Sequence, residues 1–167
     1  MRSTVRLAAA LAWLLLIALA MSGAAAPVVT LAPLTGFVAS LVQALLHPLG
    51  IDAVRAGSGG GLYVPGVFGY EITVGCTGVV AGAALTVAIL ASPGARAAKA
   101  WGLLVGVPLV LAVNLLRLAH LFYIGIHAPW RFALAHSVMW EGAVVLVTFT
   151  TWLVWTRWSA PAGEAVQ

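Results

Sequence analysis

The sequence predicts an all-α integral membrane protein. Of its 167 residues, 63% are hydrophobic and only 7% are charged, whereas a soluble domain carries about 25% charged residues. The mean hydropathy is +1.09. So few charges cannot cover a surface that faces water, and intrinsic disorder needs the opposite balance of charge and hydrophobicity. A soluble monomer and a disordered chain are therefore excluded, and lipid is the solvent that fits this composition.

About four membrane-spanning helices are expected, because a span needs about 20 mostly apolar residues. We predict them at about 7–26, 76–92, 101–123 and 135–155, in a single membrane domain that covers 1–167. The first run also fits a cleaved signal peptide. We interpret it as a retained anchor, since it is longer than a usual signal segment and Pro27 follows it directly.

Residues 27–75 are predicted to lie outside the cytoplasm. Within them, Leu34–Leu46 is moderately apolar and flanked by prolines. We interpret it as an amphipathic helix at the membrane interface, with a true span as the alternative. Ile51–Val74 contains a glycine run and a Pro65-Gly66 turn, and its β-like composition predicts a small β-hairpin-like excursion that leads into Cys76.

The basic residues set the expected orientation, because they favour the cytoplasmic side of short loops. Arg2 and Arg6 place the N-terminus in the cytoplasm. Four spans then place the C-terminus and three further basic residues on the same side: Arg96, Lys99 and Arg157. The basic residues form no patch along the sequence, so we exclude nucleic acid as a partner. We expect a multi-pass membrane protein with both termini in the cytoplasm.

Three side chains with catalytic chemistry are predicted at one level of the membrane. Helical rise places each of them about 27–31 Å from the cytoplasmic basic residue at the other end of its helix. Because the hydrocarbon core is about 30 Å thick, a thiol, a guanidinium and an imidazole all reach the outer face. These residues are Cys76, Arg117 and His136.

This trio suits acyl transfer. Nearby cations favour the thiolate of Cys76, which attacks carbonyl carbon far better than a thiol. His136 is placed to take the thiol proton and return it to the leaving amine. Arg117 is placed to stabilise an oxyanion or to clamp a substrate carboxylate. Each residue also has a structural interpretation, as a packing cysteine, an interfacial histidine and a snorkelling arginine.

Further polar residues surround the trio. Asn114 and His120 share a helix face with Arg117; we expect Asn114 to hold the guanidinium, and His120 is a rival base. Glu141 lies inside the fourth span, where a carboxylate is costly, so it pairs with Arg117, orients His136 or is protonated. No cluster has metal-ligand spacing and the glycine run is no phosphate loop, so we expect no cofactor.

Three short motifs, in this order along the chain, resemble those of the exosortase/archaeosortase family. Cys76-Thr77-Gly78 is similar to its Cys-(Ser/Thr/Asn)-Gly motif, and Asn114-Leu115-Leu116-Arg117 is similar to its Asn-x-x-Arg motif. Phe132 to His136 is similar to its aromatic-x-x-x-His motif. The compact exosortase H branch is the most similar, and the resemblance covers about 41–155.

The resemblance implies a membrane cysteine transpeptidase, a hydrolase of the cysteine protease type, with Cys76, Arg117 and His136 as its catalytic residues. It implies as partners exported proteins whose C-terminal sorting signal combines a short motif, a transmembrane helix and a basic tail. The enzyme would cut near the motif and pass the protein to an unknown acceptor nucleophile.

The residues alone leave other functions open. One alternative is a protease in which water resolves the thioester. Another is a non-catalytic scaffold or subunit, in which Arg117, Asn114 and Glu141 form a structural polar cluster. A small transporter is disfavoured, because the polar residues sit at one level rather than along the membrane depth.

Overall fold

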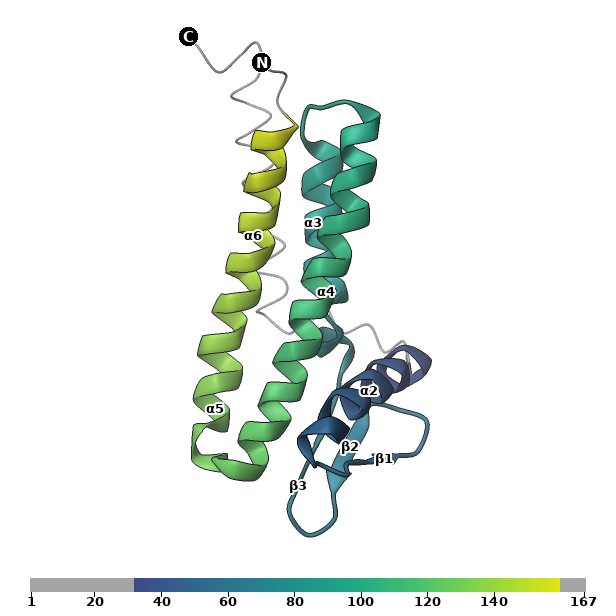
Figure 1. Ribbon diagram of the computed structural model, residues 1–167, viewed down its shortest axis with the longest axis vertical. Helices are drawn as coiled ribbons and strands as arrows, with labels where there is room; N and C mark the ends of the chain where they lie inside the picture. The colour runs from purple at the N-terminus through teal and green to yellow at the C-terminus, as the bar shows by residue number, and fades with distance from the viewer. Residues whose placement is uncertain (1–31, 160–167) are drawn as a thin grey trace.

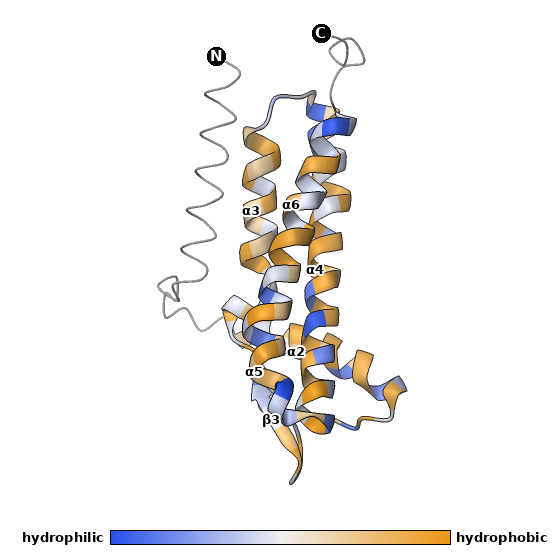
Figure 2. Cartoon of the chain, turned by 90° about the vertical axis from the view of Figure 1, so that its left-hand side faces the viewer, coloured by the Kyte–Doolittle hydropathy of each residue, from blue (hydrophilic) through white to orange (hydrophobic). Residues whose placement is uncertain are grey.

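In the computed structural model, the described part of the chain, residues 32–159, forms a helical bundle with a small α/β cap at one end (Figure 1). The bundle consists of α3 (Val79–Ala91), α4 (Arg96–His127) and α6 (Glu141–Trp158). The cap contains α2 (Ala32–Leu46) and a three-stranded sheet. Figure 2 shows apolar residues over most of the length of the bundle helices, as expected of a membrane protein.

Three helices of the described residues are long and apolar enough to cross a membrane: Ala32–Leu49, Arg96–His127 and Pro129–Trp158. The membrane character predicted from composition is thus supported, but the set of candidate spans differs from the predicted one. The predicted span at 7–26 lies outside the described residues. The interfacial position of α2 stays a prediction, since with the short 3-10 helix η1 (His47–Leu49) it is also long enough to span.

The predicted span at 76–92 is wrong in extent. α3 has 13 residues, so it is about 20 Å long and shorter than the hydrocarbon core of about 30 Å. It begins at Val79 because Gly78 has a φ of 81°, a left-handed conformation that glycine adopts at little cost. The preceding residues form a separate 3-10 helix, η2 (Val74–Thr77), which contains Cys76.

The other two predicted spans are longer than expected. α4 extends beyond 101–123 at both ends. The span predicted at 135–155 is preceded by the 3-10 turn η3 (Pro129–Arg131) and the single turn α5 (Phe132–Leu134), and it begins with a π-helix, η4 (Ala135–Trp140). π-helical turns are rare and are often found at functional sites. His136 lies in this one.

The predicted hairpin is a three-stranded antiparallel sheet. Its strands β1 (Val54–Ala56), β2 (Gly61–Val64) and β3 (Phe68–Glu71) follow one another in space as in sequence. The glycine run has a packing role, because a Cβ on Gly60 would lie 2.1 Å from the backbone oxygen of Ile72. Residues 51–53 and 72–74, the two ends of the segment with β-like composition, lie outside the sheet.

The cap packs on the C-terminal half of α4 through a shared hydrophobic core. Val42 and Leu46 of α2, Leu62 of β2 and Phe122 of α4 are all at most 1% exposed and belong to one buried cluster. Burial of a side chain of this size stabilises the fold by about 1.5–3 kcal/mol. The core therefore holds the sheet, and the turn that follows it, firmly against α4.

The end of the bundle opposite the cap carries the described basic residues that the predicted orientation places in the cytoplasm: Arg96, Lys99 and Arg157. The loop between α3 and α4 and the end of α6 meet there (Figure 1). Two tryptophans of α6 fasten this end: Trp152 Nε1 donates to Ser92 Oγ at 3.0 Å, and Trp155 Nε1 donates to the Ala98 oxygen at 2.9 Å. Arg96, which begins α4, therefore shares one end with Arg157, as predicted.

Candidate active site

The predicted site residues come from three elements that meet where the bundle joins the cap. They are η2, the middle of α4, and the junction of the π-helix η4 with α6. The cysteine motif lies at η2 and the residue before α3, the Asn-x-x-Arg motif lies in α4, and the histidine motif lies in α5 and the start of η4. Four hydrogen bonds, described in turn below, link these elements or tie the cap to α4.

Cys76 is a half-buried free thiol in the 3-10 turn before α3. The hydroxyl of Thr73 donates to its sulfur at 3.4 Å, and the backbone N–H of Cys76 donates to the Thr73 oxygen at 2.9 Å. Cys76 lies three residues before Val79, the first residue of α3. Sequence reasoning missed Thr73, whose only signal is a hydroxyl three residues before the cysteine.

Asn114 binds the nucleophile segment rather than the guanidinium. It is 1% exposed, and its Nδ2 donates to the backbone oxygen of Cys76 at 2.7 Å. A Cβ on Gly78 would lie 3.0 Å from Asn114 Cβ, so the absence of a side chain at Gly78 permits this approach. The expectation that Asn114 holds Arg117 is corrected. Its amide instead fastens the cysteine turn to α4.

Arg117 and Glu141 form an ion pair between α4 and α6. Arg117 Nη2 lies 2.6 Å from Glu141 Oε1, and the side chains are 6% and 42% exposed. This is the first of the three roles considered for Glu141. Arg117 Nε is buried without a hydrogen-bond partner. An unsatisfied buried donor of a charged group is costly, so the guanidinium retains capacity for another oxygen.

His136 is half-buried and stacks on Phe132, with ring centroids 5.9 Å apart and planes at 17°. It lies in the π-helix η4, five residues before Glu141, the first residue of α6. Within residues 32–159, His136 makes no hydrogen bond to Cys76 or Arg117. The structure therefore places the imidazole on η4, which packs on α4 as the Cys76 turn does, but does not join it to the thiol.

His120 is engaged by a tryptophan. Its Nδ1 accepts a hydrogen bond from Trp140 Nε1 at 2.9 Å, and the two rings meet edge to face at 5.6 Å. The contact ties α4 to the π-helix that carries His136. Only Nε2 of His120 is left for another partner, which weakens the case for it as the base.

Thr77 supports the cysteine turn from within. It is buried, and its hydroxyl donates to the Val74 oxygen at 2.6 Å, which closes η2 on itself. Thr77 and Gly78 thus have structural reasons for their places beside Cys76. The first closes the turn, and the second ends it.

Tyr70 is a neighbour of the site that sequence reasoning did not find. Its hydroxyl donates to the backbone oxygen of Leu118, the residue after Arg117, at 2.9 Å. Burial raises the pKa of Tyr70 well above its ordinary value, negative charge on Cys76 raises it further, and Arg117 lowers it. The phenol therefore lies within electrostatic range of both residues. In the sequence, Tyr70 can be recognised only as one tyrosine of a short strand.

Replacing Thr73 by valine is expected to slow alkylation of Cys76. The variant keeps the shape of the side chain but removes the hydroxyl that donates to the sulfur. A hydrogen bond to a charged group contributes about 1.5–3 kcal/mol, and exposure of Thr73 to solvent reduces this, so we expect roughly a three- to tenfold slower reaction with a maleimide at neutral pH. Thr86→Val on α3, whose hydroxyl bonds to Gly82, is the matched control. Equal alkylation rates for wild type, Thr73→Val and Thr86→Val would show that Thr73 does not act on the thiol.

The Tyr70 phenol is expected to ionise only well above its ordinary pKa of about 10. Because the folded state favours the neutral phenol, its contribution to stability is complete below pH about 10 and is lost as pH rises toward the higher folded pKa. Titration of tyrosinate absorbance, as the difference between wild type and Tyr70→Phe, measures this. A Tyr70 that ionises like an exposed tyrosine would contradict the burial of its hydroxyl.

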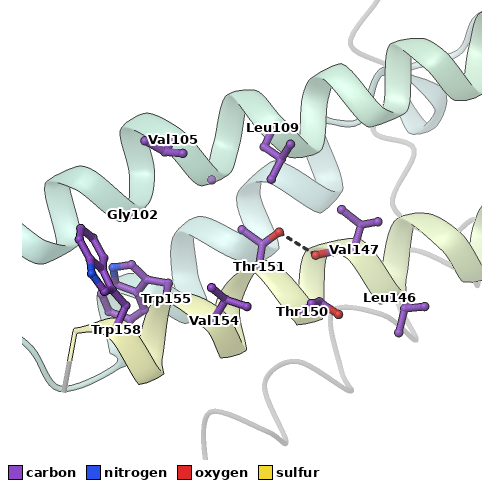
Figure 3. Close-up of a pocket in the computed structure, with 11 residues that line it drawn as sticks. Gly102, Val105, Leu109, Leu146, Val147, Thr150, Thr151, Val154, Trp155 and Trp158 are labelled. Atoms are coloured by element: carbon purple, nitrogen blue, oxygen red, sulfur yellow. Dashed lines mark hydrogen bonds between the residues drawn. The ribbon is translucent and has the colours of Figure 1, made fainter.

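An apolar groove of about 540 Å³ lies away from these residues, between the halves of α4 and α6 nearer the basic end (Figure 3). It runs from Gly102 and Trp158 to Leu109 and Leu146. None of the residues that line it is titratable, so it does not carry the proposed chemistry. Among residues 32–159, no group of three or more His, Cys, Asp or Glu side chains could hold a metal ion.

The chain matches no model of a known protein family, no curated protein and no solved structure. The resemblance to exosortases therefore stays a prediction, which rests on the three short motifs. The structure itself shows that two of these motifs lie together, because Asn114 approaches both Cys76 and Gly78.

Proposed function

We propose that this protein is a membrane cysteine transpeptidase or protease. It would cut the C-terminal sorting signal of exported proteins at the outer face of a bacterial cytoplasmic membrane, through a thioester. One observation carries the proposal: the turn with the thiol of Cys76 is fastened by Asn114 to the same helix that buries Arg117. A nucleophile held near an unsatisfied cationic donor is what acyl transfer requires.

In the proposed reaction, the Cys76 thiol gives its proton to His136 and the sulfur attacks the carbonyl carbon of the scissile peptide bond. The carbonyl electron pair moves to oxygen, where Arg117 stabilises the negative charge. The tetrahedral intermediate then expels the amine, which takes the proton from His136. A thioester is left on the sulfur, and an acceptor amine or water attacks it to release the thiol.

His136 has to approach the sulfur for this step. Catalytic hydrogen bonds are often long or absent before substrate binds and tighten in the complex. The imidazole stacks on one aromatic ring, Phe132, and lies in the π-helical turn. A rotation within that turn would bring the imidazole closer to the sulfur without a change of fold.

The proposed orientation rests on the ends of the bundle. Arg96 and Arg157 lie at one end and the cap lies at the other (Figure 1). Basic ends face the cytoplasm, which would put the cap and the cysteine turn on the outer side. The sorting motif of an exported protein would reach this level when its own transmembrane helix stands in the bilayer beside the enzyme.

The proposal is tested by co-expression with an exported protein that ends in a motif, a transmembrane helix and a basic tail. The mass of the substrate C-terminus is compared between wild type and Cys76→Ser. We expect wild type to shorten the substrate and Cys76→Ser to leave it whole, and the new mass distinguishes a water from an amine acceptor. Equal shortening by both proteins would overturn the assignment of the nucleophile.

A non-catalytic scaffold is the second candidate, because the Arg117–Glu141 pair joins two membrane helices at 2.6 Å. Interhelical polar contacts contribute about 1 kcal/mol each in membranes. A scaffold predicts that Cys76→Ala changes nothing measurable and that Arg117→Ala only destabilises the protein. The transpeptidase predicts loss of processing in both variants.

A further inference from the structure

Tyr70 connects the cap to α4 at the level of the site. Its hydroxyl donates to the Leu118 oxygen at 2.9 Å. Its ring meets Phe122 of α4 at 5.3 Å and Phe68 of β3 at 6.1 Å, both edge to face. Aromatic contacts of this geometry and the hydrogen bond together fix one orientation of the side chain.

The strand that carries Tyr70 leads directly into the nucleophile turn. Ile72 is 1% exposed, and its backbone N–H donates to the Gly60 oxygen at 2.9 Å. Thr73 and Cys76 follow, with the Thr73 hydroxyl on the sulfur. Any shift of β3 along α4 would therefore also displace the Cys76 thiol.

Two hydrogen bonds hold this segment against α4 on either side of Arg117. Asn114 Nδ2 donates to the Cys76 oxygen, and Tyr70 donates to the Leu118 oxygen. A segment held at one point is free to pivot about it, whereas two points fix its direction. The pair of bonds thus sets where the sulfur lies relative to the guanidinium.

We propose that Tyr70 is a positioning residue. It holds the Cys76 turn so that the thiol and the Arg117 guanidinium can both reach the same carbonyl group of the substrate. The inference rests on the proposed function and adds to it a role for the cap. Tyr70 acts through other groups, because its single hydroxyl proton is given to the Leu118 oxygen. Its raised pKa keeps the phenol a neutral donor over the whole range in which thiol chemistry is measured.

The test replaces Tyr70 by phenylalanine, which keeps the ring contacts and removes only the hydroxyl. Tyr63→Phe on the neighbouring strand β2, where the tyrosine is 39% exposed, is the matched control. Each variant is made with Arg117 and with Arg117→Gln. The rate of Cys76 alkylation by a maleimide is followed over a range of pH, and substrate processing is followed as kcat and KM.

We expect Arg117→Gln to change the alkylation profile in the wild-type and Tyr63→Phe proteins, and to change it much less in Tyr70→Phe. We expect kcat to fall by roughly ten- to hundredfold in Tyr70→Phe with little change in KM, because a misplacement of about 1 Å costs that much. Tyr70→p-aminophenylalanine, which restores a donor at the same reach, is expected to recover most of the loss.

The inference is overturned if Tyr70→Phe keeps both the wild-type alkylation profile and the wild-type kcat. It is also overturned if the variant lowers only the thermal stability, which a purely structural tyrosine would do. An altered alkylation profile in a protein whose wild type processes no substrate would support the positioning role and overturn the proposed function. The alkylation experiment therefore separates the two failures.

Discussion

Cys76→Ala is expected to lower processing of the sorting signal by at least about a thousandfold, as loss of a catalytic nucleophile does. No other residue of the chain can form a thioester, because Cys76 is its single cysteine. The fold should survive, since two of the hydrogen bonds that hold the turn, to Thr73 and from Asn114, use the backbone of residue 76. The time course of substrate shortening measures the effect.

The single cysteine also provides a control for this prediction. Alkylation of wild type by a maleimide should block processing in step with the modified fraction, while Cys76→Ala should take up no label. Thermal unfolding of both proteins in detergent checks that they are folded. Full processing by completely alkylated wild type would show that the thiol is not the nucleophile.

Arg117→Gln is expected to lower kcat/KM by about a hundred- to a thousandfold, the usual cost of losing an oxyanion donor. Its effect on stability should be small, because the Glu141 carboxylate that it leaves behind is 42% exposed and remains hydrated. Arg117→Lys should fail to restore activity, since an ammonium group lacks the planar set of donors.

Glu141→Gln is the matched comparison for Arg117→Gln, because it breaks the same ion pair from the other side. It leaves the guanidinium, 6% exposed, without its counter-charge. Breaking a fully buried pair costs about 3–5 kcal/mol, and the exposure of Glu141 reduces this to roughly 1–2 kcal/mol. Glu141→Gln should therefore unfold at lower temperature than Arg117→Gln yet retain more activity. The reverse order in both measurements would favour the scaffold.

The sequence predicts the membrane class, but it does not predict the contacts that the candidate site residues make in the structure. Composition alone excludes a soluble chain, and an arginine in an apolar run requires a partner, which Glu141 provides. The spacing of Asn114 and Arg117 shows that they share a helix face. It does not show which neighbour that face meets, so the bond from Asn114 to the Cys76 backbone was not predicted.

Helix ends and local distortions account for most of the remaining differences. An apolar run does not reveal that Gly78 adopts a left-handed conformation, and this moves the start of α3 from Cys76 to Val79. The π-helix around His136 has no sequence period of its own, so the apolar run did not predict it. Tyr70 was missed because strand alternation reports which face a residue occupies and not the group that it reaches across the fold.

The most direct test of the central claim is the mass of the intact protein, quenched in acid during a single turnover with a sorting-signal substrate. The proposed chemistry predicts a transient adduct on Cys76 with the mass of the N-terminal part of the substrate. Hydroxylamine should release that adduct, and Cys76→Ala should never acquire it. Cleavage of the substrate while the mass of the protein stays unchanged throughout the turnover would contradict a thioester intermediate.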